Sequence, residues 1–164
     1  MPDTRPALSP AAQHVQDTLR ALGRDYPVHE SERSTRTSAE AAQAVGCQVG
    51  QIAKSLVFRA VNSGHAVLVI ASGANRVDEG RLAKLLGEPV GRAGPDFVRE
   101  HTGYAIGGVA PVGHASPLPI FIDEDLLAFD QIWAAAGTPN AVFPLPPSDL
   151  PALTGGRVVP IRAA

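Results

Sequence analysis

The amino-acid sequence predicts one α/β domain of the α+β type, in which a mixed, largely antiparallel sheet is flanked by helices. Segments with helical periodicity alternate with β-rich runs, and the turn sequence Asn62-Ser63-Gly64 joins two of those runs as a hairpin. Such a hairpin argues against an all-parallel, doubly wound sheet. The chain has 164 residues, of which 45% are hydrophobic, so we expect one domain over residues 1–164.

The first third of the chain predicts a helix, a short strand and a second helix. Residues 9–23 begin with a serine followed by Pro10, carry apolar residues at helical spacing and end on a glycine. Residues 26–29 predict a short strand. In residues 37–46, a threonine followed three positions later by a glutamate has the form of a capping box and opens an alanine-rich helix. The polar residues 30–36 are expected to be exposed or functional.

The middle of the chain predicts the centre of the sheet and two more helices. Residues 56–58 and 66–71 are rich in strand-forming side chains and are expected to be central strands. Residues 78–86 predict a helix that Gly87 closes, and residues 95–101 predict a shorter helix.

The last third predicts a strand over residues 119–123, a short helix over 124–129, and two late strands over 140–145 and 157–161. The two ends of the chain, residues 1–6 and 162–164, are expected to fray.

Composition excludes several classes of protein. Cys47 is the only cysteine, so an internal disulfide is impossible, and neither Cys/His spacing nor the five scattered histidines suggest a metal site; no metal or cofactor is expected. The absence of a signal-like or membrane-length apolar run predicts a cytoplasmic protein. A net charge of −2 argues against binding nucleic acid by bulk charge, so any RNA contact has to be local.

Lys54 lies near the start of the strongly apolar run 52–58. An ammonium at this place is desolvated unless it reaches an anion or the mouth of a cavity, which suggests a functional role. The alternative is a lysine that extends its charge to solvent from a strand end.

Residues 102–114 contain too many glycines for a strand and too many apolar residues for a solvated linker. Gly107 and Gly108 allow close backbone approach to a ligand, and Pro111 fixes the loop's shape, so loop N–H groups can bind a carbonyl oxygen or an oxyanion. The alternative is a tight turn at a sheet edge. No Walker-type phosphate loop and no nucleophile elbow is present, and covalent catalysis is not favoured.

Four stretches form a pattern that covers nearly the whole chain. They are Arg36-Thr37-x-x-Glu40-Ala41-Ala42, Gln51-Ile52-Ala53-Lys54-Ser55-Leu56-Val57-Phe58, Leu82-x-x-Leu85-Leu86-Gly87 and Thr102-Gly103-Tyr104-x-x-Gly107-Gly108-x-x-Pro111-x-Gly113. The agreement extends to Leu118-Pro119-x-x-Ile122-Asp123 and Ala136-Gly137. This pattern resembles the YbaK/ProX family of aminoacyl-tRNA editing domains, which is related to the insertion domain of bacterial prolyl-tRNA synthetases.

The resemblance implies a trans-acting aminoacyl-tRNA deacylase that hydrolyses the ester of tRNA mischarged with a small amino acid of the Ala, Cys or Pro type. Lys54 matches the family's key lysine and would contact the phosphate of the terminal adenosine. Gly107 to Pro111 match the loop that positions the aminoacyl carbonyl. The catalytic candidates are therefore Lys54 and Gly107, and the substrate-binding candidates are Thr37, Ser55, Gly103, Gly108, Val109, Ala110, Pro111, Gly113, His114 and Asn140.

The implied partners are the aminoacylated acceptor end of tRNA and, as an open alternative, an aminoacyl-tRNA synthetase. His114 and Ala115 follow Gly113 where several relatives carry basic residues, which is a departure from the pattern. Two other functions stay open: a non-catalytic module that holds a tRNA end or a synthetase, and hydrolysis of a different small ester or amide.

Overall fold

The computed structural model describes residues 7–164, and the fraying expected of residues 1–6 lies outside the described residues. The helices are α1 Pro10–Ala21, α2 Ser38–Val45, α3 Glu79–Leu86, α4 Pro95–Thr102 and α5 Leu150–Thr154, with short 3-10 helices η1 Val49–Gln51, η2 Glu124–Ala128 and η3 Pro147–Asp149. The strands are β1 His29–Glu30, β2 Ile52–Ala60, β3 Ala66–Ser72, β4 Val90–Arg92, β5 Ile120–Asp123, β6 Ile132–Ala135, β7 Ala141–Leu145 and β8 Arg157–Val159.

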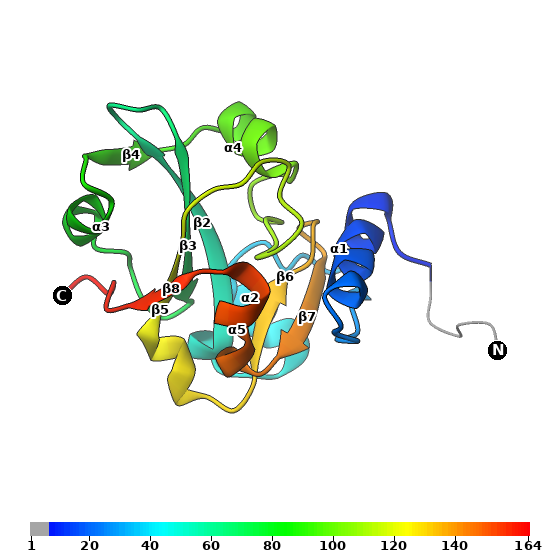
Figure 1. Ribbon diagram of the computed structural model, residues 1–164. Helices are drawn as coiled ribbons and strands as arrows, with labels where there is room; N and C mark the ends of the chain where they lie inside the picture. The colour runs from blue at the N-terminus through cyan, green and yellow to red at the C-terminus, as the bar shows by residue number, and fades with distance from the viewer. Residues whose placement is uncertain (1–6) are drawn as a thin grey trace.

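All of these strands join one mixed sheet in the order β1-β7-β6-β2-β3-β5-β8, with β4 paired to β2 (Figure 1). The pairs β1–β7, β6–β7, β2–β3 and β2–β4 are antiparallel, whereas β2–β6, β3–β5 and β5–β8 are parallel. The predicted mixed, largely antiparallel sheet flanked by helices is confirmed, and β2 with β3 forms the predicted hairpin.

Helices cover both faces of this sheet because β2 and β3 carry apolar side chains on both faces. Leu68 and Ile70 pack in the larger core, with α1, α5 and the segment that follows α4, whereas Val67 and Val69 pack in a second core with α3. A small third cluster joins α2 to the start of β2 and to β6. Within residues 7–164, no helix is long and apolar enough to cross a membrane.

Local signals account for the helix ends. The Thr37 hydroxyl accepts a hydrogen bond from the Glu40 N–H at 3.1 Å, and Asp78 caps α3 in the same way through the Arg81 N–H at 3.0 Å. Gly87 ends α3 with a φ of 90°, in the left-handed region that glycine tolerates. At the C-terminus, where fraying was expected, Arg162 forms a β-bridge with Val77, and the Ala163 N–H donates to the Arg76 carbonyl.

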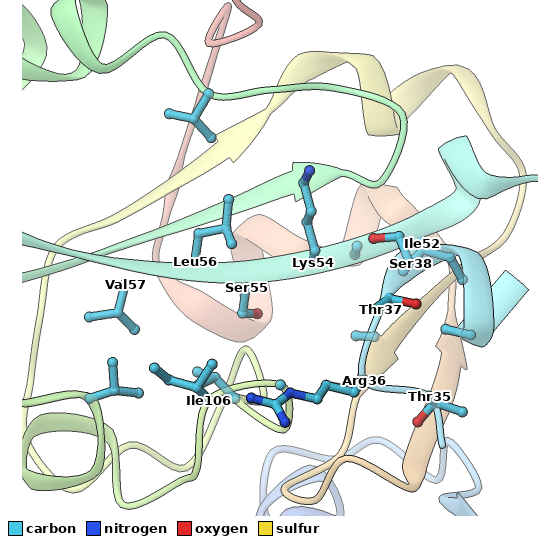
Figure 2. A pocket seen from close by; sticks show the side chains of 18 of the residues that line it. Thr35, Arg36, Thr37, Ser38, Ile52, Lys54, Ser55, Leu56, Val57 and Ile106 are labelled. Carbon is cyan, nitrogen blue, oxygen red and sulfur yellow. The ribbon is translucent and has the colours of Figure 1, made fainter. Parts of the chain in front are cut away.

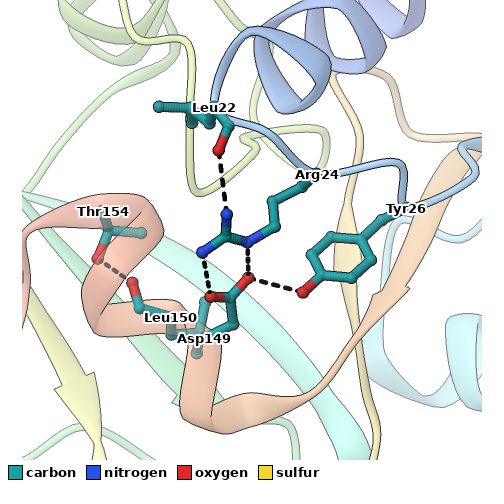
Figure 3. Close-up of polar contacts among 6 residues, drawn as sticks. All are labelled: Leu22, Arg24, Tyr26, Asp149, Leu150 and Thr154. Carbon is teal, nitrogen blue, oxygen red and sulfur yellow. Dashed lines mark hydrogen bonds and ion pairs between the residues drawn. The ribbon is translucent and has the colours of Figure 1, made fainter.

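The segment that follows α1 is tied to the C-terminal part of the chain by a polar cluster (Figure 3). The Arg24 guanidinium donates to both carboxylate oxygens of Asp149, at 2.7 and 2.8 Å, and the Tyr26 hydroxyl donates to the same carboxylate at 2.6 Å. The hydrogen bond from Arg24 holds the pKa of Asp149 below its ordinary value of 3.8. These contacts fix the segment after α1 against η3.

We expect Tyr26→Phe to lower the free energy of unfolding by about 1–2 kcal/mol at pH 7, because it removes a hydrogen bond to a charged acceptor. A carboxyl group with a lowered pKa contributes its stability above the unfolded pKa and loses it as pH falls through the folded pKa. The difference between Tyr26→Phe and wild type should therefore shrink in urea unfolding carried out below pH 3.8. Tyr104→Phe is the control, because the Tyr104 hydroxyl donates to the Val112 carbonyl, which does not titrate. An acid-independent cost for Tyr26→Phe would contradict the role given to Asp149.

Candidate functional site

The sheet has a gap in its middle. One edge of β2 pairs with β3 along most of its length, but the other edge pairs with β6 only at Ile52 and Ala53 and with β4 only from Phe58 to Ala60. Between these two contacts, residues 54–57 have no strand beside them in the part of the chain that the structure describes.

The gap exposes main-chain polar groups of two residues. The Ala60 N–H donates to the His65 carbonyl, and the Gly73 N–H donates to the Ile52 carbonyl, so even-numbered residues of β2 face β3. Since backbone groups alternate between the two edges of a strand, the N–H and C=O groups of Ser55 and Val57 face the open edge. The Val57 carbonyl is used in the pairing of Phe58 with Arg92 on β4, so a ligand beside this edge finds the N–H and C=O groups of Ser55 and the N–H group of Val57.

A cavity of about 630 Å³ lies at this gap, within the range usual for small-ligand pockets. Figure 2 shows how it reaches both faces of the sheet: Lys54 and Leu56 project from one side of β2, and Ser55 and Val57 from the other. Its walls are otherwise supplied by α2 and the loop before it, the start of α3, β4, α4, β6 and the loop after α4. The lining residues include the cations Arg36, Lys54, Arg76 and Arg92 and the acid Glu79.

Lys54 is anchored inside this cavity. Its ammonium donates to the Asn75 carbonyl at 2.6 Å. Burial lowers the pKa of Lys54 from its ordinary value, and the charge of Asp123 opposes that shift. A carbonyl is a neutral acceptor, so the positive charge stays available to an anion that enters the cavity.

Ser55 faces the opposite side of the strand, toward Arg36 and Ile106 (Figure 2). Its hydroxyl oxygen is buried and has no hydrogen-bond partner among residues 7–164. Buried polar atoms without a partner are rare in native proteins, and one in a cavity wall is available to a ligand.

The loop after α4 forms the wall opposite Ser55 and Val57. Gly107 and Val109 line the cavity, and their N–H groups take part in no backbone hydrogen bond within residues 7–164. The loop is held from behind: the Gly137 N–H donates to the Gly108 carbonyl at 2.9 Å, and a Cβ on Gly108 would lie 2.7 Å from the backbone of Thr138. Two unpaired amides on a fixed loop can polarise a carbonyl.

Arg36 closes this side of the cavity. A Cβ on Gly107 would lie 2.6 Å from Arg36 Cγ, so the arginine side chain passes directly over that glycine. The guanidinium has no ion pair or side-chain hydrogen bond with any residue that the structure describes.

The cavity brings five of the predicted site residues together, namely Thr37, Lys54, Ser55, Gly107 and Val109. The others lie outside its lining: Gly103, Gly108, Ala110, Pro111, Gly113, His114 and Asn140. His114 Nε2 donates to the Ala110 carbonyl at 2.7 Å, and Asn140 donates to the carbonyls of Glu32 and Arg33. These two side chains support the loops around the cavity, and their contact with substrate stays a prediction.

Comparisons with known proteins agree on the family. The family model described as "Aminoacyl-tRNA editing domain" matches residues 32–153. This chain belongs to the aminoacyl-tRNA editing domain family. A crystal structure of a candidate trans-editing enzyme for prolyl-tRNA synthetase superposes on the editing domain with a TM-score of 0.90, at 51% identity, covering 96% of this chain and 100% of the other.

Two curated relatives of the editing domain are similar over most of their length. The uncharacterized protein YwhH of Bacillus subtilis is 32% identical over 135 residues, which is 82% of this chain and 85% of YwhH. EbsC of Enterococcus faecalis, whose name describes a candidate Cys-tRNA(Pro)/Cys-tRNA(Cys) deacylase, is 31% identical over 126 residues, which is 76% of each chain.

Sequence reasoning missed several residues that line the cavity of the editing domain. Arg76 and Arg92 line the cavity, but neither is among the predicted site residues. Trp133 and its neighbours on β6 were not predicted to be a strand at all. Arg36 belongs to the motif Arg36-Thr37-x-x-Glu40. Its position directly before the helix cap Thr37 is the signal that could have indicated an arginine held at the site.

Proposed function

We propose that this editing domain hydrolyses the ester bond between a small amino acid and the terminal ribose of tRNA, releasing the free amino acid and uncharged tRNA. The observation that carries the proposal is the shared cavity, in which an anchored ammonium and a loop with unpaired amides line the same space. Family membership supports the reaction class.

In the proposed complex, the Lys54 ammonium exchanges the Asn75 carbonyl for the phosphate of the terminal adenosine. Arg76 lines the same cavity and adds positive charge near the entering backbone. This local basic site suits a chain whose net charge is −2, because the attraction acts where the tRNA end enters and nowhere else.

The aminoacyl group then lies between the open edge of β2 and the loop at Gly107. The amides of Gly107 and Val109 donate to the ester carbonyl, and the carbonyl of Ser55 accepts from the α-ammonium group. Water attacks the carbonyl carbon, and the ribose oxygen leaves with a proton, with a neighbouring ribose hydroxyl positioning the water. An aminoacyl ester is activated already, so orientation and carbonyl polarisation supply the rate without a nucleophilic side chain.

Apolar side chains set the size of the acyl site. Val57, Val98 and Ile106 line the cavity next to the loop and exclude bulky amino acids by steric clash. A difference of one methylene separates substrates by only about 1–3 kcal/mol in such a pocket, so alanine, cysteine and proline are expected to overlap as substrates.

The test is a panel of tRNAs charged with alanine, cysteine, proline, leucine or phenylalanine and incubated with the purified protein. We expect release of the small amino acids above the spontaneous rate and no acceleration for leucine or phenylalanine. Saturable binding of the small aminoacyl-tRNAs with no release would instead identify a non-catalytic binding module. Equal release from short esters without RNA would indicate a different esterase.

A further inference from the structure

Asp123, at the end of β5, is a fully buried acid without an ion-pair partner among the described residues. One carboxylate oxygen accepts hydrogen bonds from the Ser72 N–H at 3.0 Å and from Asn75 Nδ2 at 2.9 Å. The other accepts from the Asp125 N–H at 2.9 Å. A buried carboxylate is expensive unless it is compensated, and here three hydrogen bonds hold it at the end of the strand.

The turn that Asp123 holds, residues 72–75, is the turn that carries the anchor of Lys54. The Asn75 N–H donates to the Ser72 carbonyl at 2.9 Å, and the Ser72 hydroxyl donates to the Gly50 carbonyl at 2.7 Å. At Gly73, an added Cβ would lie 2.5 Å from the Val49 carbonyl oxygen. The turn is therefore packed tightly against η1, and only its far end, the Asn75 carbonyl, points to the ammonium.

We propose that Asp123 is a positioning residue for Lys54. Asp123 accepts a hydrogen bond from the side chain of Asn75, the residue whose carbonyl receives the ammonium, and its buried negative charge attracts that ammonium. The connection runs from β5 through the turn after β3 to β2, three strands that are neighbours in the sheet. The effect of this positioning on catalysis rests on the proposed function, whereas the positioning of Lys54 by Asp123 does not.

The other charged groups around Lys54 differ from Asp123 in exposure. Arg36, Arg76 and Glu79 line the same cavity and are exposed. Asp125 also accepts from Asn75 Nδ2, at 2.8 Å, but it pairs with Arg162 at 3.5 Å, and both of those side chains are partly exposed. Water screens the exposed groups, so the buried carboxylate is expected to dominate the field at the ammonium.

The chain contains only two lysines, Lys54 and Lys84, which makes a direct measurement feasible. Protein labelled with ¹³C at lysine Cε gives two signals, assigned with Lys84→Arg, whose titration is followed by NMR. We expect Asp123→Asn to move the Lys54 midpoint to lower pH by about one unit, because it removes a nearby opposite charge. The exposed Lys84 should not move, and Glu79→Gln should shift Lys54 less than Asp123→Asn does. An unchanged Lys54 midpoint in folded Asp123→Asn overturns the proposal.

If Asp123→Asn does not fold, a second variant tests the same proposal. Asn75→Ala keeps the carboxylate and the backbone carbonyl but removes the side-chain link between them. Relaxation of the Lys54 Cε signal should then show faster local motion, with Lys84 unchanged. If the Lys54 side chain stays as ordered as in wild type, Asp123 does not position it through Asn75.

Deacylation assays separate this inference from the proposed function. With the spontaneous rate subtracted, the alkaline fall in kcat for Asp123→Asn should begin at lower pH than in wild type, since activity needs the charged lysine. If wild type releases no amino acid from any tRNA, the proposed function fails, and the NMR titration still decides the role of Asp123.

Discussion

Lys54→Ala is expected to reduce the release of a small amino acid from mischarged tRNA at least tenfold, which corresponds to about 1.4 kcal/mol of transition-state stabilisation. The variant removes the one ammonium in the cavity and leaves the Asn75 carbonyl without its donor. In the proposed complex, that ammonium binds phosphate and sets how far the ester enters. A single-turnover assay with excess protein measures the chemical step directly.

Two matched variants show whether the charge or its geometry matters. Lys84→Ala removes the other lysine, which is exposed on α3, and should leave the rate unchanged. Lys54→Arg keeps the charge but replaces a compact ammonium by a planar group, and should recover only part of the activity. Equal rates for wild type and Lys54→Ala would exclude the lysine from the mechanism.

Gly107→Ala should also reduce the rate tenfold or more, with the protein still folded. Gly107 has a φ of 89°, where an L-residue is strained by about 1–2 kcal/mol, and the new Cβ would meet Arg36 Cγ at 2.6 Å. Either the loop or the arginine has to shift, and both line the cavity. Deacylation rates and thermal unfolding on the same samples distinguish a damaged site from a damaged fold.

Gly64→Ala is the control for strain alone, because Gly64 has a φ of 77° with nothing within 4 Å of an added Cβ. It should lower stability and leave the rate intact. A double variant, Gly107→Ala with Arg36→Ala, should recover activity in part if the contact with the arginine is the cause. Full activity in Gly107→Ala would show that the loop amides do not position the carbonyl.

Much of the fold could be predicted because its signals are local. Thr37 and Asp78 cap helices through hydrogen bonds to residues three positions away, and a glycine follows the last turn of α3. The hairpin of β2 and β3 follows from two long apolar runs around a turn sequence. β4 and β6 were missed because they are short and contain glycine or alanine in place of β-branched side chains, so their pairing depends on distant partners.

The candidate site was predictable only in part for the same reason. Lys54 and Gly107 each stand out in the sequence because a charge interrupts an apolar run and glycines interrupt a hydrophobic segment. The gap beside residues 54–57 could not be foreseen, since it arises where two unpredicted strands end. Asp123 belongs to a recognised motif, but nothing local shows that its carboxylate reaches Asn75 across the sheet.

Strands that lack a neighbour commonly invite other chains to add to them and so promote aggregation. In this protein the unpartnered stretch of β2 is only four residues long and is bounded by β4 at one end and β6 at the other. A foreign strand cannot extend its pairing past those two boundaries, whereas a compact molecule fits between them. The unused main-chain groups of β2 can therefore bind a small ligand without promoting aggregation at this edge. Shortening β4 or β6 would remove this protection.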